Sequence, residues 1–352
     1  LPLVTEAWQI YVLIFLLQSA SATFTPTFQA VIPSVLPDER EYTRALSLSR
    51  LAYDLESLVS PMLAAALLTA ISFNNLFIGT VIGFLGSATL VIASRFPHTQ
   101  PPPPARFLDR LSRGTRTFFA SPELRGLMGL NLVVATTTAM VIVNTVVVVK
   151  AEGGLGDDAV AMALAAYGAG SMAAALLVPR LLGGGAWTDR AVMLAGGGVL
   201  VAGMAAGWAL AAAPLAVLLP LWAALGFGNG AALTPAGRVL RRSAQPGDRP
   251  ALFAAQFALS HACWLVTYPL AGWLGAVAGT AVAFAALAAV TALGVLLAAR
   301  LWPAHDPEEV EHVHADLPPG HHHLAGAEPL PGGGHRHWHA LVIDEDHRRW
   351  PA

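Results

Sequence analysis

The sequence predicts an all-α polytopic membrane protein with about nine transmembrane helices. Of its 352 residues, 55% are apolar and only 12% are charged, which is about half the charged fraction of a typical soluble domain. The charges gather in short clusters, and nearly charge-free stretches of about 20 residues run between them. A soluble helical bundle would need a polar face on most of its helices. These stretches lack such a face and therefore favour lipid as the surrounding solvent.

Nine apolar stretches are long enough to cross the hydrocarbon core of a bilayer, which is about 30 Å thick. In chain order they cover residues 7–30, 45–70, 76–93, 127–149, 159–182, 191–212, 215–237, 252–276 and 280–299. Some of the connections are as short as Ala213-Pro214, and others are longer and basic. This alternation of short and long connections is expected when short turns lie on one side of the membrane.

The arginines orient these nine stretches. If all nine cross the membrane, the arginine clusters between them fall on one side, whereas Lys150 falls on the other. These clusters are Arg40 and Arg44, then Arg95 to Arg125, Arg180 and Arg190, Arg238 to Arg249, and finally Arg300. Because basic loops stay in the cytoplasm, we expect the amino terminus outside and the carboxyl-terminal tail in the cytoplasm.

Residues 96–123 form a predicted cytoplasmic linker between two membrane halves, which cover residues 1–95 and 124–302. The linker holds Pro101-Pro102-Pro103-Pro104 and then an arginine-rich amphipathic segment at 107–119. A proline run makes a stiff spacer, and a basic amphipathic helix binds anionic lipid. We therefore expect a spacer followed by a helix that lies on the membrane surface.

A pattern of prolines and one arginine occurs twice at nearly the same spacing. The first copy is Thr25-Pro26, Pro37, Arg40 and Pro61, and the second is Thr234-Pro235, Pro246, Arg249 and Pro269. A proline inside a helix kinks it, so the predicted kink and packing positions are Pro26, Pro61, Pro235 and Pro269. More than three helices precede the second copy, but only part of one precedes the first. The repeat therefore predicts a chain truncated at its amino end, with nine of an original twelve helices.

The run from Thr25 to Arg40, the arginine-rich linker and the repeat resemble the major facilitator superfamily, especially its bacterial drug- and siderophore-exporter-like branch. The resemblance covers about residues 7–302 and implies two six-helix halves, with helices four to six in 1–95 and helices seven to twelve in 124–302. The antiporters of that family carry Gly-Pro-x-x-Gly-Gly in helix five, where this chain has Ser60-Pro61 followed by Ala64-Ala65. The second-half counterpart of the family's acidic-basic gating motif, Asp189-Arg190, is only loosely similar.

Three ionisable residues lie within the second predicted span: Arg50, Asp54 and Glu56. Such residues cost about 2.5–3.5 kcal/mol each at membrane depth and usually face a cavity or a partner. Arg50 and Asp54 are four residues apart, so they share a helix face and can pair. They predict a proton or substrate site between the halves, and the alternative is an ion pair that only fixes helix packing. Glu56, which has no evident partner on this helix, is the first candidate for carrying the proton.

Four further polar residues interrupt the apolar spans: Asn131, Asn144, Asn229 and His261. The asparagines can line a central cavity, or they can hydrogen-bond neighbouring helices and hold them together. His261 can relay protons because an unperturbed imidazole titrates near neutral pH. The alternative is a buried, neutral and hydrogen-bonded histidine.

The tail, residues 303–352, is rich in histidine. Interleaved glycines and prolines predict a disordered segment with no folded domain. Imidazole suits Ni, Co, Zn and Cu, and nickel-resistance exporters of the resembled superfamily carry similar tails. The candidate ligands are His312, His314, His321, His322, His323, His335, His337 and His339, and His305 and His347 also lie in the tail. The alternative is a low-complexity tail with incidental metal affinity.

These observations predict a multi-pass secondary transporter of the bacterial inner membrane, driven by protons and exporting a small solute. Divalent transition metal ions are one candidate substrate. The alternatives are export of a hydrophobic drug-like molecule, or a transport-dead fragment that acts as a metal-binding sensor or scaffold. No nucleophile–base set or phosphate loop occurs in the sequence, so we expect no enzyme activity and no required cofactor. The expected partners are the solute and the lipid bilayer, with no nucleic acid, and the expected state is a monomer.

Overall fold

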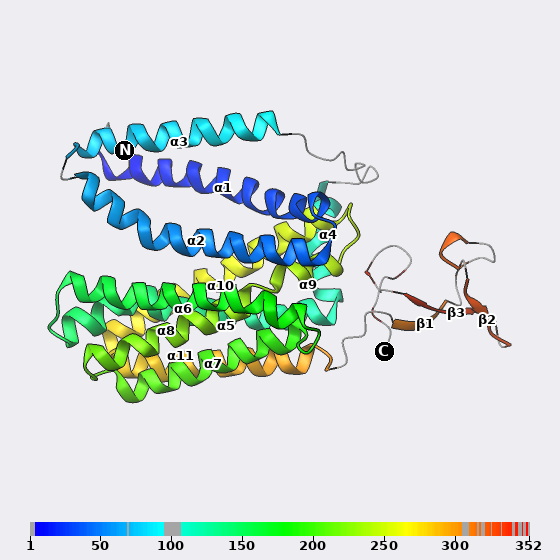
Figure 1. Ribbon diagram of the computed structural model, residues 1–352. Helices are drawn as coiled ribbons and strands as arrows, with labels where there is room; N and C mark the ends of the chain where they lie inside the picture. The colour runs from blue at the N-terminus through cyan, green and yellow to red at the C-terminus, as the bar shows by residue number, and fades with distance from the viewer. Residues whose placement is uncertain are drawn as a thin grey trace.

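The computed structural model describes residues 4–68, 70–94, 107–304 and several shorter stretches between 310 and 350. Almost all of the described chain before the tail is helical (Figure 1). The long helices are α1 (Ala7–Val35), α2 (Glu39–Leu68), α3 (Phe73–Ala93), α5 (Pro122–Val146), α6 (Asp157–Gly183), α7 (Asp189–Leu210), α8 (Leu215–Leu233), α10 (Arg249–Ala278) and α11 (Thr280–Leu301). Two shorter helices are α4 (Phe107–Ala120) and α9 (Ala236–Arg242), and a π-helical turn, Val147–Glu152, extends α5.

The predicted spans coincide with these long helices. Eight helices of the described chain are long and apolar enough to cross a membrane. The ninth predicted span is occupied by α2, a 30-residue helix that is not among the eight. Its charged residues, among them Arg50 and Asp54, make it the least apolar of the long helices. The fold is that of an all-α polytopic membrane protein.

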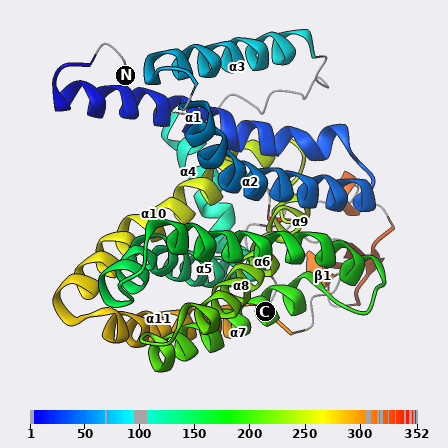
Figure 2. The same cartoon turned by 60° about the vertical axis from the view of Figure 1, so that its left-hand side comes forward.

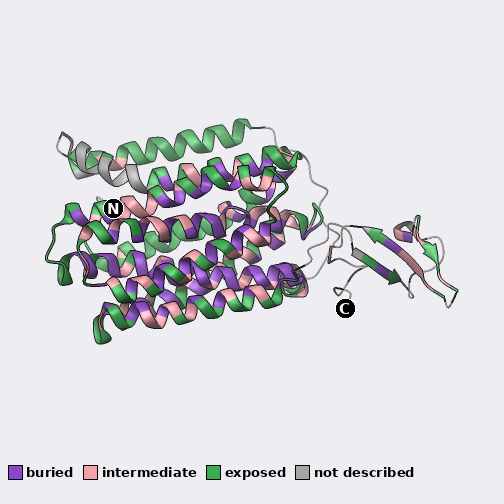
Figure 3. Cartoon of the chain, turned by 60° about the horizontal axis from the view of Figure 1, so that its bottom comes forward, coloured by how far each residue is buried: buried purple, intermediate pink, exposed green. Residues whose placement is uncertain are grey.

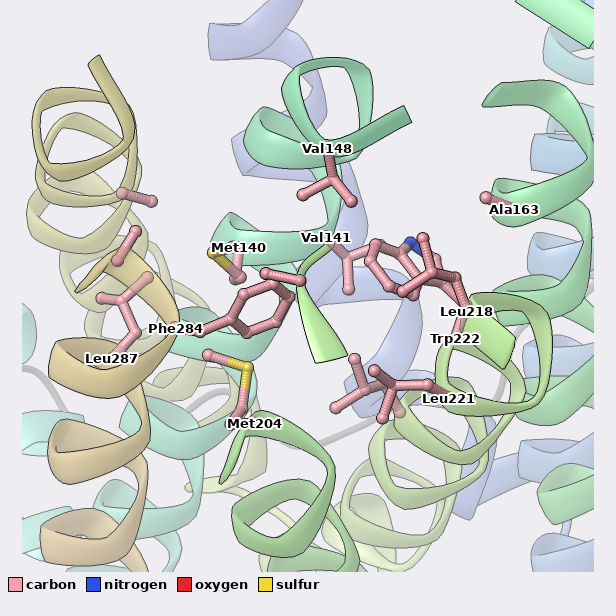
Figure 4. Packing of buried hydrophobic residues seen from close by; sticks show 14 of the residues in the cluster. Met140, Val141, Val148, Ala163, Met204, Leu218, Leu221, Trp222, Phe284 and Leu287 are labelled. Atoms are coloured by element: carbon pink, nitrogen blue, oxygen red, sulfur yellow. The ribbon is translucent and has the colours of Figure 1, made fainter. Parts of the chain in front are cut away.

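Six helices of the carboxyl-terminal half, α5 to α8 with α10 and α11, share one core (Figure 4). At its centre the ring of Trp222 meets the ring of Phe284 edge-on, with 6.3 Å between the ring centroids. The indole Nε1 of Trp222 donates a hydrogen bond of 2.8 Å to the hydroxyl of Thr145. Trp222 is 1% exposed and Thr145 is fully buried, so this polar contact lies inside an apolar cluster.

Thr145→Val is therefore expected to destabilise the protein by about 1–3 kcal/mol, because the buried indole N–H loses its acceptor. Thermal unfolding in detergent micelles measures the change. Thr89→Val is the matched control, because the Thr89 hydroxyl is exposed and bonds only the carbonyl of Leu85 in its own helix. Equal melting temperatures for the two variants would contradict a structural role for the Trp222–Thr145 bond.

Glycines allow α6 and α8 to approach closely. A Cβ atom added at Gly170 of α6 would collide with the backbone carbonyl of Ala223, and one added at Gly226 of α8 would collide with that of Tyr167. At Gly230 the added atom would lie 2.7 Å from the carbonyl oxygen of Ser171. Small residues at such positions let membrane helices pack backbone to backbone.

The proline pattern of the repeat appears in matching helix pairs, α1–α2 and α8–α10. Pro235 lies in the break between α8 and α9, as expected for a proline that interrupts a helix. Pro26 and Pro269 lie inside α1 and α10, which continue through them. The side chain of Pro61 lies outside the described residues, and kinks at Pro26, Pro61 and Pro269 stay predictions.

The three amino-terminal helices lie along one side of the six-helix half (Figure 2). α1 packs against α10, α2 packs against α6, and α3 contacts α2. The described residues of α3 are exposed or partly exposed along its whole length, whereas the six-helix half has many buried ones (Figure 3). The amino-terminal helices therefore meet the six-helix half through α1 and α2 and not through α3.

Helix α4 differs from the predicted surface helix on lipid. Phe118 is completely buried, and at Gly114 an added Cβ atom would collide with the backbone carbonyl of Ala251 in α10. Arg113 forms an ion pair of 3.1 Å with Asp248, at the start of α10. The described part of this amphipathic helix packs on protein through Phe118 and Gly114, and α4 belongs to the body of the carboxyl-terminal half.

The prediction of a tail without folded structure is wrong for the described residues. Strands β1 (Val310–His314), β2 (Glu328–Pro329) and β3 (His335–His339) form an antiparallel sheet in the order β1-β3-β2. A 3-10 turn, His322–Leu324, lies between β1 and β2. Glycines with positive φ, such as Gly326 and Gly333, make the turns that bring the short strands together.

Candidate transport site and histidine cluster

The junction of α2 and α6 contains a buried ion pair. Arg50 contacts Asp54 in a two-pronged arrangement, with Nη2 at 3.0 Å from Oδ1 and Nε at 3.2 Å from Oδ2. The guanidinium also donates to the hydroxyl of Ser171 in α6, with 2.9 Å between Nη2 and Oγ. Asp54 is 6% exposed and Ser171 is fully buried. The pair thus joins a helix of the amino-terminal half to one of the carboxyl-terminal half.

Polar groups continue from this pair into the six-helix half. The side chain of Tyr167, one turn from Ser171 on α6, lies within electrostatic range of Arg50 and Asp54. Its hydroxyl is 3.5 Å from the hydroxyl of Thr138 in α5. Tyr167 and Thr138 thus extend the polar groups near this junction from α6 to α5.

Glu56 does not join this arrangement. It is exposed, and it lies two residues beyond Asp54, so it is about 200° away from Asp54 around the helix. Asp54 faces α6 and Glu56 faces away from it. The geometry therefore places Asp54, and not Glu56, at the contact between α2 and α6.

Two of the predicted asparagines connect α5 to α10. Asn131 and Gln256 exchange two amide hydrogen bonds, of 3.0 and 2.9 Å. Asn144 donates to the carbonyl oxygen of Ala271 at 3.1 Å, and Gly275 leaves the space that the Asn144 amide occupies. These contacts are those of asparagines that hold helices together.

Asn229 of α8 is as buried as Asn131, at 3% exposed, but its hydrogen bonding is different. Its Oδ1 atom has no hydrogen-bond partner among the described residues. A buried acceptor without a partner costs about 1–3 kcal/mol, so this oxygen is suited to binding a donor that enters from outside the chain. Asn229 therefore stays a candidate site residue.

His261 is exposed, so the structure differs from the alternative of a buried histidine. Its Nδ1 lies 2.7 Å from the carbonyl oxygen of Phe257 on the same helix, so the Nδ1–H group donates a hydrogen bond to that oxygen. The ring stacks on Phe257, and the aromatic row continues through Trp264 to Tyr268. His261 is hydrogen-bonded as predicted, but the bond lies within α10.

A charge network at the arginine-rich end of the helices also joins the two halves. Arg238 of α9 pairs with Asp189 of α7 at 2.9 Å and reaches Glu39 and Thr43 of α2. Arg242 pairs with Asp189 at 3.0 Å and with Glu123 of α5 at 2.7 Å. Arg241 donates to the carbonyl oxygen of Pro37, and the Tyr42 hydroxyl donates to that of Gly237.

Sequence reasoning identified Asp189 only as part of a loosely matching motif and did not find its partners. Glu39, Glu123, Asp189, Arg238 and Arg242 come from four separate helices, so sequence spacing gives no sign that they meet. The only signal was that each stands at the end of an apolar stretch. Arg190, the neighbour of Asp189, donates to the last carbonyl oxygens of α11 at Ala299 and Trp302.

Comparison with known families decides what these helices form. The sequence profile of the Major Facilitator Superfamily matches residues 1–190 and, in a second overlapping match, residues 127–343. The chain belongs to the Major Facilitator Superfamily. No curated protein matches the chain.

As a major facilitator protein, the chain is a multi-pass membrane transporter for a small solute, in a family of transporters and not of enzymes. The α2–α6 ion pair and the charge network lie where the amino-terminal helices of this major facilitator meet the six carboxyl-terminal ones.

Asp189→Asn is expected to destabilise this major facilitator by about 2 kcal/mol. Removing one partner of a buried pair costs about 3–5 kcal/mol, and we expect less here because Arg242 reaches solvent. Asp157→Asn is the control, because Asp157 pairs with Lys150 at an exposed site where ion pairs contribute about 0–1 kcal/mol. The free energy of unfolding of both variants is measured in detergent, and dye labelling of the single cysteine, Cys263, reports the unfolded fraction. A loss at Asp189 no greater than at Asp157 would contradict this role.

The structure brings together four of the eight predicted metal ligands. His312, His314, His323 and His337 gather with His347, which the sequence prediction had left out of the ligand set. His321 and His335 lie outside this cluster, and the side chains of His322 and His339 lie outside the described residues. We call His312, His314, His323, His337 and His347 the five-histidine cluster.

Proposed function

We propose that this major facilitator protein exports a small solute in exchange for protons, and that Asp54 binds the coupling proton. The observation that carries the proposal is the buried Arg50–Asp54–Ser171 contact between α2 and α6. Ionisable residues at membrane depth usually serve proton or substrate movement. A carboxylate at the junction of the two halves can couple its protonation to their relative position.

The coupling follows from the charges. With Asp54 ionised, the guanidinium of Arg50 is neutralised and aimed at Ser171 of α6. A proton on Asp54 removes that negative charge and leaves Arg50 to be satisfied by α6 or by water. Proton binding thereby changes the free energy of the α2–α6 contact, and linkage requires that movement at this contact change proton affinity in return.

Two substrate classes remain for this site. Divalent transition metal ions are the first, and the histidines of the tail support testing them. Hydrophobic drug-like molecules are the second, supported by the aromatic row of Phe257, Trp264 and Tyr268 on α10. A chain that transports neither class and acts as a metal-binding scaffold is the third candidate.

The proposed setting is the bacterial inner membrane, with the chain as a monomer. The arginine-rich ends of the helices would face the cytoplasm, because basic loops are retained there. The tail follows α11 at this end and would lie in the cytoplasm too, with the amino terminus outside.

Transport by purified full chain in lipid vesicles with an acidic interior tests the proposal. Ni²⁺, Zn²⁺ and ethidium are added outside in separate experiments, and indicator dyes inside the vesicles report entry. We expect one class to accumulate, and nigericin, which collapses the pH gradient, to stop it. Accumulation that ignores the gradient would contradict proton coupling, and entry of neither class would favour the scaffold.

A further inference from the structure

The five-histidine cluster gathers imidazoles from four separate segments of the tail. His312 and His314 lie on one face of β1, His337 pairs with His312 across the sheet, and His323 comes from the 3-10 turn. His347 joins them from the end of the chain. One ligand nitrogen from each of the five lies within 4.8 Å of the others.

The nitrogens at the centre cannot all be satisfied by hydrogen bonds among themselves. Nε2 of His347 lies 2.9 Å from Nε2 of His312, 3.0 Å from that of His323 and 3.2 Å from that of His314. A neutral imidazole has one N–H group and one acceptor nitrogen. A single nitrogen facing three others can form an ordinary hydrogen bond with only one of them and leaves lone pairs or N–H groups opposed at the rest, and protonating the rings would place like charges together. A cation between them removes this conflict.

The spacing is that of ligands around one ion. Metal–imidazole bonds of about 2.0–2.1 Å place neighbouring nitrogens about 2.9 Å apart in an octahedral site and about 3.3 Å apart in a tetrahedral one. The three distances to His347 lie within this range. The nitrogens of His312, His314, His323 and His347 fit a single metal ion better than separate hydrogen-bonded pairs, and the nitrogen of His337 lies within 4.8 Å of them.

The burial of these histidines, together with the small apolar core of the tail, indicates that the sheet needs a bound ion for stability. His312, His314, His337 and His347 are each 9% exposed or less, and Leu324 and Ile343 are the buried apolar residues of the described tail. So small an apolar core rarely stabilises a sheet alone, and small domains often depend on a bound metal.

We infer that the five-histidine cluster is a binding site for one late first-row divalent cation of the Ni²⁺, Co²⁺, Cu²⁺ or Zn²⁺ group. Imidazole donors select these ions over Mg²⁺ and Ca²⁺, which prefer oxygen. The nearby carboxylates, Glu311 and Glu328, pair with Arg336. Five nitrogens exceed the four ligands of a structural zinc site. We therefore expect Ni²⁺ and Co²⁺, which can take more than four ligands, to be bound by the largest number of these imidazoles. This inference does not rest on the proposed function.

Equilibrium dialysis of the full chain in detergent against Ni²⁺ tests the site, with a purification tag that contains no histidine. We expect one tightly bound ion per chain. The double variant His312→Ala/His337→Ala should lower the affinity by at least about 100-fold, because loss of even outer partners of a metal ligand costs 10- to 100-fold. The matched control is His335→Ala, which lies opposite His314 in the sheet but contributes no nitrogen to the cluster, and it should lower the affinity far less than the double variant.

X-ray absorption of the unmutated chain loaded with Ni²⁺ keeps the inference testable if the variant sheet fails to fold. Four or five imidazole nitrogens around the ion are expected. Two or fewer, or several weak sites that every histidine substitution reduces equally, would overturn the inference and identify an incidental histidine-rich tail. Neither measurement needs transport, so failure here is distinct from failure of the proposed exchange.

Discussion

Asp54→Asn is expected to reduce proton-driven solute flux by about 100-fold or more, the range typical of losing a positioned acid–base group. The amide keeps the shape of the carboxylate and can still accept a hydrogen bond from Arg50, but it binds no proton in the physiological range. The variant therefore removes coupling and leaves the helix contact largely in place. Initial flux into vesicles with an acidic interior measures the effect.

Glu56→Gln is the matched control for that experiment. Glu56 lies on the same helix but faces away from α6 and takes no part in the Arg50–Asp54–Ser171 contact, so its neutralisation should leave the flux largely unchanged. A loss of flux in Glu56→Gln as large as that in Asp54→Asn would contradict the assignment of the coupling proton to Asp54 alone. Full flux in Asp54→Asn would reduce the Arg50–Asp54 pair to a packing contact.

Gly170→Ala is expected to destabilise the protein by about 3 kcal/mol, the upper part of the range for overpacked sites. The added methyl group meets the backbone of Ala223 and Phe227 in α8, and a backbone cannot turn aside as a flexible side chain can. The two helices would have to separate along their closest contact. The loss should appear as a lower melting temperature in detergent, reported by dye labelling of the buried Cys263.

Gly168→Ala provides the control two residues away on the same helix. A methyl group at Gly168 meets no atom within 4 Å, and alanine favours a helix interior by about 1 kcal/mol over glycine. We expect this variant to match or exceed the parent in stability. If Gly170→Ala were equally stable, the close approach of α6 and α8 would be wrong.

The helices could be predicted because lipid imposes a strong and local rule. Each span needs an uninterrupted apolar stretch, and every predicted stretch contains a helix, α2 included. The break between α8 and α9 at Pro235 also follows from local chemistry, whereas α1 and α10 continue through Pro26 and Pro269. The pairing of Arg50 with Asp54 needed only their spacing on one helix.

Contacts between distant segments could not be predicted in this way. Ser171 lies 121 residues from Arg50, and nothing in its surroundings indicates that it meets a guanidinium. Asp189 gathers its arginines through the packing of α7 against α9. In the tail, the glycines predict disorder from composition alone, yet Gly326 and Gly333 make turns of the sheet in which His337 pairs with His312.

The claim that solute is exchanged for protons through Asp54 is tested most directly by measuring proton movement that the solute gradient alone drives. Vesicles containing the full chain and an entrapped pH dye start with equal pH on both sides, and the transported solute is then added outside. If solute entry expels protons, the interior becomes alkaline, and this change should disappear in Asp54→Asn. Solute entry without any pH change would contradict proton exchange at the α2–α6 junction.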